Sequence, residues 1–472
     1  MTGKLIRKDR VRTVLALFAG AICIAAAHSA SPPLVVHEWG TFTSFQDSRG
    51  RTISGINVDD EPVPRFVHRL RDFQTFRTTS LPASWSQGAP RCFPGVTLRL
   101  ETPVLYFYPP TGWLSKPFDV RATFNGGWLT EFYPAATTDG MDVQQAVDRE
   151  TRGSLLWRQV RLDAAGAAAL KPRTDSHVWL APRAVSAALV VNETAREAEK
   201  YLFYRGVGNL DAPIVVRETG GKLEISLREN ETGLEQLPRL WLVDVDREEK
   251  VRFQSIAPTG RSVTVPALPR AAPGDASRLE ELKRELTAEL MRSGLFADEA
   301  AAMLDTWRLS YFESEGLRVF FLLPQQWTDA RLPLSISIPS TVTRVMVGRV
   351  ELVTAGQRDA LRKLHSLPDE AFAISPLYAQ DREALRLLQE GGRSHAELYR
   401  AVGREVPQSL QLYESLGRFR DALLAHEWQN ESSAARRARL ERVLRLYGAC
   451  DAGLRSEQVT DGRPTSAPPP AE

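Results

Sequence analysis

Two segments of the chain place ionisable side chains beside aromatic ones, and their residues could carry out acid–base chemistry. His37 and Glu38 are adjacent in the run His-Glu-Trp-Gly-Thr-Phe-Thr at 37–43. Glu131 lies in Trp-Leu-Thr-Glu-Phe-Tyr at 128–133, an apolar setting that would favour the protonated carboxyl needed for general acid work. Brought together, these side chains could hydrolyse an extracellular ester, glycoside or peptide, so His37, Glu38 and Glu131 are the candidate catalytic residues.

The segment at 37–43 has the composition of a β-strand, which argues against a joint role for its first two residues. Successive side chains of a strand point to opposite faces, so His37 and Glu38 would not meet one substrate unless a β-bulge turned them together. The alternative is an N-terminal strand in which Trp39 packs in the core and His37 is hydrogen-bonded.

Aromatic rings near these segments could instead bind a ligand, because flat rings stack on the apolar faces of sugars. The candidate binding residues are Trp39, Trp128, Tyr133 and Arg205. The alternative is that the rings fill the interior of the sheet. Glu131 would then pair with an arginine such as Arg121 or Arg205.

Sequence signatures of common catalytic and cofactor sites are missing. The chain has no H-E-x-x-H, no C-x-x-C-H, no G-x-S-x-G and no Walker A loop, and its 7 histidines are scattered without ligand spacing. We therefore predict no metal and no cofactor.

The first thirty residues have the order of a secretory signal. A basic stretch at 4–12 precedes an apolar run at 14–27, and small residues follow, so cleavage would leave a mature chain beginning near Ala30 or Ser31. An uncleaved anchor is the alternative, but the run is shorter than the roughly 20 residues that span a bilayer. We expect a periplasmic or secreted protein with no transmembrane helix after cleavage.

Composition limits the kind of partner. The 472 residues are 43% hydrophobic and carry a formal net charge of only +2, spread without a basic block, which excludes the electrostatic footprint of a nucleic-acid-binding protein. The expected partner is an envelope polymer or another protein.

Export to an oxidising compartment would allow the cysteines to pair. Of the 3 cysteines, Cys23 would leave with the signal, so the mature chain keeps Cys92 and Cys450. These could form one disulfide that ties the C-terminal region to the N-terminal part, or remain two separate buried thiols.

The elements that would position these residues change along the chain. Short strand-like runs separated by turns continue to about residue 266, with the clearest hairpin at 214–218 and 222–227 around Gly220-Gly221. A short apolar run at 177–180 also reads as a strand, helices are expected near 277–293 and 298–312, and amphipathic helices follow residue 354.

The predicted fold class is α+β, with β-sandwich-like N-terminal domains, a helical hairpin on strands and an all-α C-terminal region. The expected parts are a signal peptide at 1–30, a β-rich domain at 31–170, a second β-sandwich-like domain at 171–270, a helical hairpin with strands at 271–355, a helical region at 356–450 and a disordered tail at 451–472.

Several phrases of the chain resemble those of an uncharacterised family of exported bacterial proteins with the His-Glu-Trp-Gly-Thr-Phe-Thr segment near the mature N-terminus. The similar segments lie at 37–43, 101–108, 129–134, 204–209, 305–313 and 344–352. The family has no known activity, so the resemblance implies export and one continuous architecture over about residues 35–355, and it transfers no catalytic residue.

These observations favour an exported, non-catalytic envelope or secreted protein that binds a polymer or another protein. The alternative is an extracytoplasmic hydrolase that uses a polar centre of His37, Glu38 and Glu131.

Overall fold

The computed structural model describes residues 32–58, 61–73, 85–113, 116–166, 170–246, 248, 250–268, 276–390 and 394–448. The predicted signal peptide, the predicted disordered tail and Cys450 lie outside the described residues. None of the described helices is long and apolar enough to cross a membrane.

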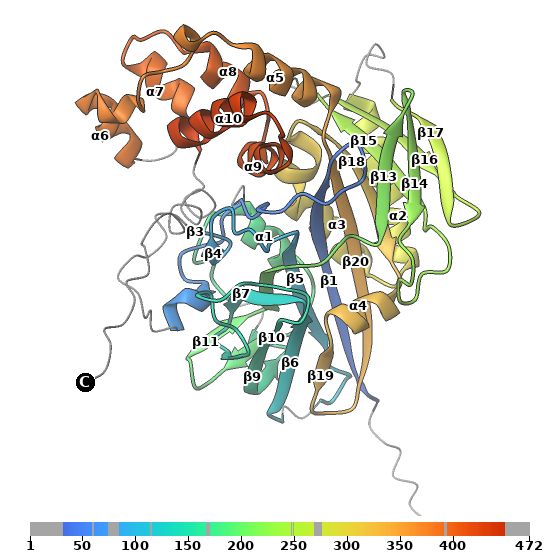
Figure 1. Cartoon of the computed structure of the whole chain (residues 1–472). Coiled ribbons are helices and arrows are strands. Elements are labelled where there is room, and N and C mark those ends of the chain that lie inside the picture. The colour runs from blue at the N-terminus through green and yellow to red at the C-terminus, as the bar shows by residue number, and fades with distance from the viewer. Residues whose placement is uncertain are drawn as a thin grey trace, which may run out of the picture. The chain divides into compact units, whose positions relative to one another are not determined.

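Most described strands belong to one mixed sheet of fifteen strands (Figure 1). Its main path runs through β11 (Glu197–Glu199), β10 (Leu189–Asn192), β9 (Arg152–Asp163), β7 (Gly127–Tyr133), β12 (Leu202–Gly208), β5 (Leu98–Tyr108), β1 (Leu34–Gln46), β20 (Ser340–Leu352), β18 (Gly316–Leu323), β15 (Leu240–Val245) and β16 (Val251–Ile256). Its side branches are β2 (His68–Arg69), β6 (Phe118–Asn125), β8 (Thr137–Asp139) and β19 (Leu334–Ile336). Separate from it are β13 (Ile214–Thr219), β14 (Lys222–Leu227) and β17 (Ser262–Pro266), which form a three-stranded sheet, and the small pair β3 (Trp85–Ser86) and β4 (Ala89–Pro90).

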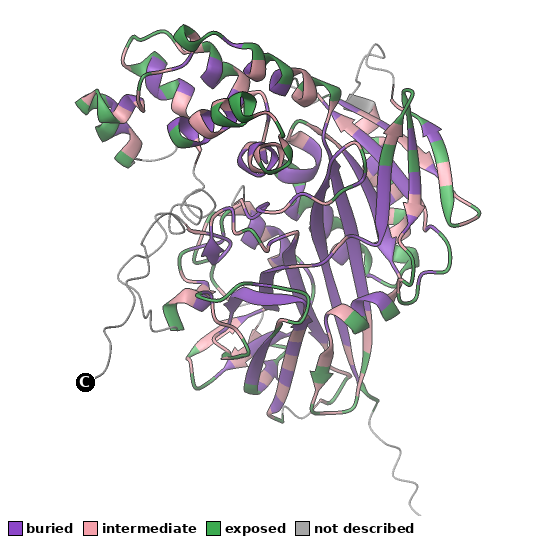
Figure 2. Cartoon of the chain, in the orientation of Figure 1, coloured by how far each residue is buried: buried purple, intermediate pink, exposed green. Residues whose placement is uncertain are grey.

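The N-terminal strand β1 is central in the large sheet. It pairs antiparallel with β5 and parallel with β20, in a register that places Leu34 beside Ser340 and Gln46 beside Leu352. Figure 2 shows that β1 and its neighbours are almost entirely buried. The first and the last strand of the described chain therefore meet in the middle of one sheet.

Helices follow the strands mainly in the second half of the chain. They are α1 (His177–Arg183), α2 (Ala276–Arg292), α3 (Ala297–Thr306), α4 (Gln325–Arg331), α5 (Ala355–Ser366), α6 (Arg382–Glu390), α7 (His395–Ala401), α8 (Gln408–Glu414), α9 (Arg420–Asn430) and α10 (Ala434–Tyr447), with a π-helix at Arg308–Glu313 and 3-10 turns at Leu70–Phe73, Asp369–Ala371 and Leu377–Ala379.

The side chains of β1 join three apolar clusters. Val36 and Phe42 belong to the cluster that includes β13, β14 and β17. On the other face, Trp39 packs in the cluster with α2 and α3, and Phe45 in the cluster with the C-terminal helices. We call this second face the helix-facing side of the sheet.

The mixed α+β class is confirmed, as are the hairpin around Gly220-Gly221 and the C-terminal helices. The predicted strand at 177–180 is wrong: these residues begin α1, and a four-residue apolar run cannot distinguish the two states by periodicity. The predicted helix at 298–312 ends as α3 at Thr306 and is followed by the π-helix. The β-sandwich detail is not confirmed. Strands from 31–170, 171–270 and 271–355 join the same large sheet, and the proposed domain boundaries stay predictions.

Candidate functional site

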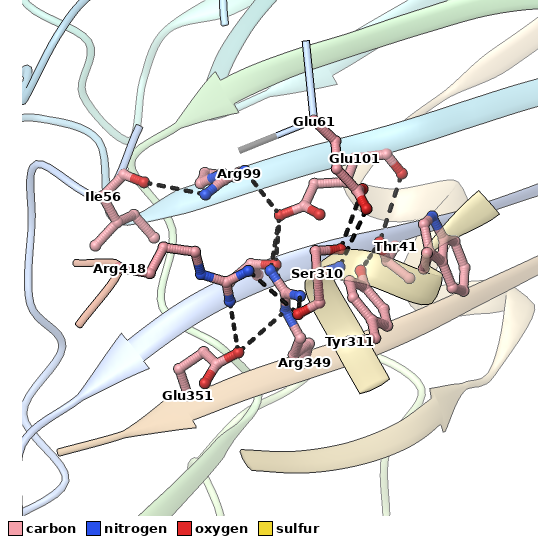
Figure 3. Close-up of polar contacts among 12 residues, drawn as sticks. Thr41, Ile56, Glu61, Arg99, Glu101, Ser310, Tyr311, Arg349, Glu351 and Arg418 are labelled. Carbon is pink, nitrogen blue, oxygen red and sulfur yellow. Dashed lines mark hydrogen bonds and ion pairs between the residues drawn. The ribbon is translucent and has the colours of Figure 1, made fainter. Parts of the chain in front are cut away.

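A row of buried polar side chains crosses the helix-facing side of the large sheet. It follows six neighbouring strands, β7, β12, β5, β1, β20 and β18. All of its sheet residues are less than a tenth exposed: Glu131, Arg205, Arg99, Glu101, Thr43, Arg349, Glu351 and Arg318. We call this row the polar band, and Figure 3 shows its central part.

Two arginines share the carboxylate of Glu101 at the centre of the band. Arg349 approaches it at 3.1 Å and also donates from Nε to Thr43 Oγ1 at 2.9 Å. Arg99 lies 3.2 Å from the same Glu101 oxygen, and Thr43 donates to that oxygen at 2.7 Å. These contacts join β5, β1 and β20 through side chains as well as through backbone ladders.

Glu351 is the second shared carboxylate. Its Oε1 lies 3.3 Å from Arg318 Nε, 3.5 Å from Arg349 Nε and 2.7 Å from Arg418 Nη2. Arg418 precedes α9, so this contact links the sheet to the C-terminal helical region.

The π-helix lies over the band at Ser310. The Ser310 carbonyl accepts hydrogen bonds from Arg318, Arg349 and Arg418 at 3.0–3.2 Å. Glu61 accepts from the Ser310 amide and hydroxyl, both at 3.1 Å. Single-turn π-helices are frequent at functional sites, and here the widened turn presents one carbonyl to three guanidinium groups.

Strand irregularities coincide with the band. The register shifts between Trp39 and Thr41 where β1 meets β5, and between Arg205 and Gly206 where β12 meets β7. Opposite the first shift, Thr102 has a φ of 47°, an unusual value for a β-branched residue. Bulges re-aim side chains, and these shifts lie among β1, β5, β12 and β7, whereas β1, β20 and β18 pair without a shift.

The arginines of the band hold charge rather than exchange protons. Burial lowers the pKa of Arg318 to about 10, and nearby Arg418 and Arg349 act in the same direction while Glu351 opposes them. At neutral pH Arg318 is still protonated. The arrangement can therefore stabilise negative charge, but its arginines do not supply a general base.

The structure places the three candidate catalytic residues in separate contacts. His37 Nδ1 lies 2.8 Å from Glu299 Oε2 on α3. Glu38 accepts from Tyr204 Oη and Arg344 Nε on the opposite face.

Glu131 pairs with Arg205 and lies 3.3 Å from Arg69 Nε. Two strands, β5 and β12, separate β7 from β1. Three strand spacings amount to roughly 14 Å, so Glu131 is beyond hydrogen-bonding reach of His37 and Glu38. The residues of the band that motif reasoning missed, above all Ser310, Arg318, Arg349 and Glu351, have partners far away in sequence and no local signature.

The predicted binding residues fill the interior instead of forming a surface platform. Trp39, Trp128 and Tyr133 are at most 2% exposed, and Arg205 is 3% exposed. Cys92 does not carry a free thiol. Because Cys450 lies outside the described residues, its pairing with Cys92 stays a prediction.

Two hollows adjoin on the described surface. The larger, of about 1310 Å³, is lined chiefly by the segment 231–239 together with Glu289, Ser293, Pro324 and Gln326. The second, of about 750 Å³, contains Arg149, Arg217, Arg228 and Arg331. Glu231 lines both and lies 3.6 Å from Arg331. Among the residues that the structure describes, no group of three or more His, Cys, Asp or Glu side chains could hold a metal ion.

No family model and no curated protein matches the chain. Among solved structures, it is similar to the Fcho1 Mu homology domain of Danio rerio with bound Eps15 peptide, with a TM-score of 0.27 and 10% identity over 68% of this chain and 98% of that chain. A similarity at this level supports no statement about fold or function.

Proposed function

We propose that the protein is an exported, non-catalytic envelope or secreted protein that binds a polymer or another protein in the two adjoining hollows. The observation that carries this proposal is the larger hollow, whose volume of about 1310 Å³ exceeds that of ordinary small-molecule pockets. An extended ligand suits it, because the smaller hollow continues it beyond Glu231.

The side chains of these hollows suit polar recognition. Exposed Thr232, Glu235 and Gln236 lie along one wall of the larger hollow, and exposed Gln326 also lines it. These groups offer hydrogen-bond donors and acceptors to hydroxyl or amide groups of a polymer. The smaller hollow adds charged groups of both signs, because Arg149 and Arg228 pair with Asp211 and Arg331 pairs with Glu231.

The hydrolase alternative has less support. It needs His37, Glu38 and Glu131 in one centre, whereas each has its own buried partner and Glu131 is three strands away.

Export and membership of the uncharacterised exported family are part of the proposal. Support comes from the segments that carry the resemblance, because each contributes to the polar band or its π-helix: Thr43, Glu101, Glu131, Arg205, Ser310 and Arg349. We infer that the band is the shared structural core of such proteins, and that β13, β14 and β17 pack on the large sheet in a local β-sandwich-like arrangement.

Co-sedimentation with isolated bacterial sacculi and outer-membrane fragments tests the binding proposal. We expect Thr232→Trp, which fills the larger hollow, to weaken binding at least fivefold. The matched variant Thr219→Trp changes an exposed threonine outside both hollows and should bind like the parent. Equal binding by Thr232→Trp would exclude the hollow, and no binding by the parent to either material would contradict a polymer-binding role.

A further inference from the structure

The strand β17 forms an outer edge of the three-stranded sheet. Within the described residues it pairs only with β14, in an antiparallel register that places Ser226 beside Ser262 and Lys222 beside Pro266. An edge of this kind presents unpaired backbone groups to a further strand.

Two flanking hydrogen bonds show which groups of β17 point outward. Leu227 N donates to Arg261 O at 2.9 Å, and Ala267 N donates to Gly221 O at 3.1 Å. Bonding in an antiparallel ladder alternates, so the residues at 261, 263, 265 and 267 bond to β14. The N–H and C=O groups of Ser262 and Thr264 therefore point away from the sheet.

The other edge of the three-stranded sheet, β13, is covered. On β13, the Gln46 side chain donates to Ile214 O and accepts from Val216 N, each at 2.9 Å, and Ser48 O accepts from Glu218 N. These contacts occupy the outer backbone groups of β13.

The two strands that end the main path of the large sheet, β16 and β11, are also protected. On β16, Arg278 donates to the carbonyl of Phe253 at 2.9 Å. The opposite edge strand, β11, is only three residues long and carries Glu197 and Glu199. Charges, prolines and short edge strands are usual defences against strand addition, and of these β17 has only Pro266, at its C-terminal end.

The residues of β17 are uncharged. Ser262 and Thr264 are exposed, whereas Val265 is buried in the apolar cluster and Val263 packs against it. No charge on the strand would repel a second strand brought to its edge.

We propose that β17 is a self-association surface at which two copies of the chain pair antiparallel about a two-fold axis at Val263. In that register Ser262 of each copy lies opposite Thr264 of the other. Both residues direct their backbone groups outward, so each Ser262–Thr264 pair exchanges two hydrogen bonds, four in all. The two three-stranded sheets become one six-stranded sheet. This inference does not depend on the proposed binding function.

Sedimentation velocity over a concentration series tests the association. We expect a reversible monomer–dimer equilibrium that Thr264→Pro weakens at least tenfold. Proline is tolerated at position 264 because the Thr264 N–H points away from β14 and makes no hydrogen bond to it. Circular dichroism of the variant should therefore show an unchanged fold. Thr264→Lys should act in the same direction, and its matched control Thr232→Lys should not. A parent chain that stays monomeric throughout, or a dimer unaffected by Thr264→Pro, would overturn the proposal.

Cysteine crosslinking tests the register itself. Val263→Cys places two cysteines directly opposite each other with Cα atoms about 4.5 Å apart, within disulfide range. Thr264→Cys places them two residues out of register, about 8–9 Å apart and too far to bridge. We expect a disulfide-linked dimer from the first variant alone. If both cysteine variants crosslinked equally, or if neither crosslinked, the two-fold axis at Val263 would be contradicted.

Discussion

Arg349 on β20 and Glu101 on β5 form an ion pair of 3.1 Å that spans β1, the strand between them. Thr43 of β1 lies in the same contact, accepting from Arg349 and donating to Glu101. Three strands are thus connected by one chain of side-chain hydrogen bonds beneath the π-helix. All three residues are buried, so these interactions are not weakened by solvent.

Replacing Arg349 with leucine should destabilise the protein strongly. The substitution would remove one of the cations that neutralise buried Glu101 and Glu351. Breaking a buried ion pair by removing one partner typically costs about 3–5 kcal/mol. Guanidinium-induced unfolding followed by tryptophan fluorescence measures the change.

The matched control for this prediction is Arg292→Leu. Arg292 also pairs with a glutamate, Glu289, but its side chain is 58% exposed. Exposed pairs contribute little, so we expect a change within about 0.5 kcal/mol. If both variants lost a similar free energy of unfolding, the buried ion pairs of the polar band would contribute no more to stability than an exposed pair.

The alternation of side chains along a β-strand was sufficient to predict that His37 and Glu38 lie on opposite faces of the sheet. As expected for a strand, His37 and Glu38 contact different sides of the sheet, and Trp39 packs in the core. Likewise, the pairing of Glu131 with Arg205 agrees with one of the two arginines considered from sequence.

The polar band could not be predicted in this way, because its partners are remote in sequence. Arg349 and Glu101 are separated by 248 positions. Ser310 lies where helical periodicity continues smoothly from α3, so nothing local marks the change to a π-helix. The register shifts beside the band arise from pairing between strands, which a single sequence does not reveal.

Gly206→Ala should be destabilising because the bulge at this position brings two strands close together. A Cβ atom added at Gly206 would lie 2.0 Å from the Trp128 carbonyl oxygen, a backbone atom that cannot move aside easily. Overpacking of this kind typically costs about 1–3 kcal/mol. The matched control is Gly260→Ala, whose Cβ would meet no atom within 4 Å. Equal thermal midpoints for the two variants would contradict the close approach.

Asp47 should contribute stability that disappears in acid. Burial alone would raise the pKa of this carboxyl, but hydrogen bonds from His426, Arg51 and the Arg49 amide outweigh burial and hold the pKa well below its usual range. A folded-state pKa below the unfolded value stabilises the protein above about pH 4, and the contribution is lost as the pH falls through the folded value. Asp47→Asn should therefore be less stable than the parent at neutral pH, with the difference shrinking in acid.

Unfolding free energies at neutral pH and below about pH 4 test this linkage. Asp305→Asn is the control, because it removes an exposed carboxylate and should leave stability similar to that of the parent at both pH values. A stability difference for Asp47→Asn that is independent of pH would show that the carboxylate acts through packing alone.

The predicted Cys92–Cys450 disulfide gains support from contacts near both cysteines. Arg91 lies 3.7 Å from Asp421 on α9, and Tyr413 Oη lies 2.6 Å from Asp421 and 3.1 Å from Tyr447 O. Tyr447 is the last residue of α10, and three further residues of chain, at most roughly 11 Å, reach position 450. The loop before Cys92 is therefore connected to the end of α10 through described residues.

We expect the mature chain, from Ser31 onward, to show no free thiol when it is purified without reductant and unfolded. Cys450→Ser should lower the free energy of unfolding by about 2–4 kcal/mol, because a crosslink that closes so long a loop restricts the unfolded chain. The reduced proteins provide the control: with the bridge open, parent and Cys450→Ser should unfold alike. Two titratable thiols in the unreduced parent would exclude the disulfide, and a stability difference that persists under reduction would assign the effect of Cys450 to packing instead.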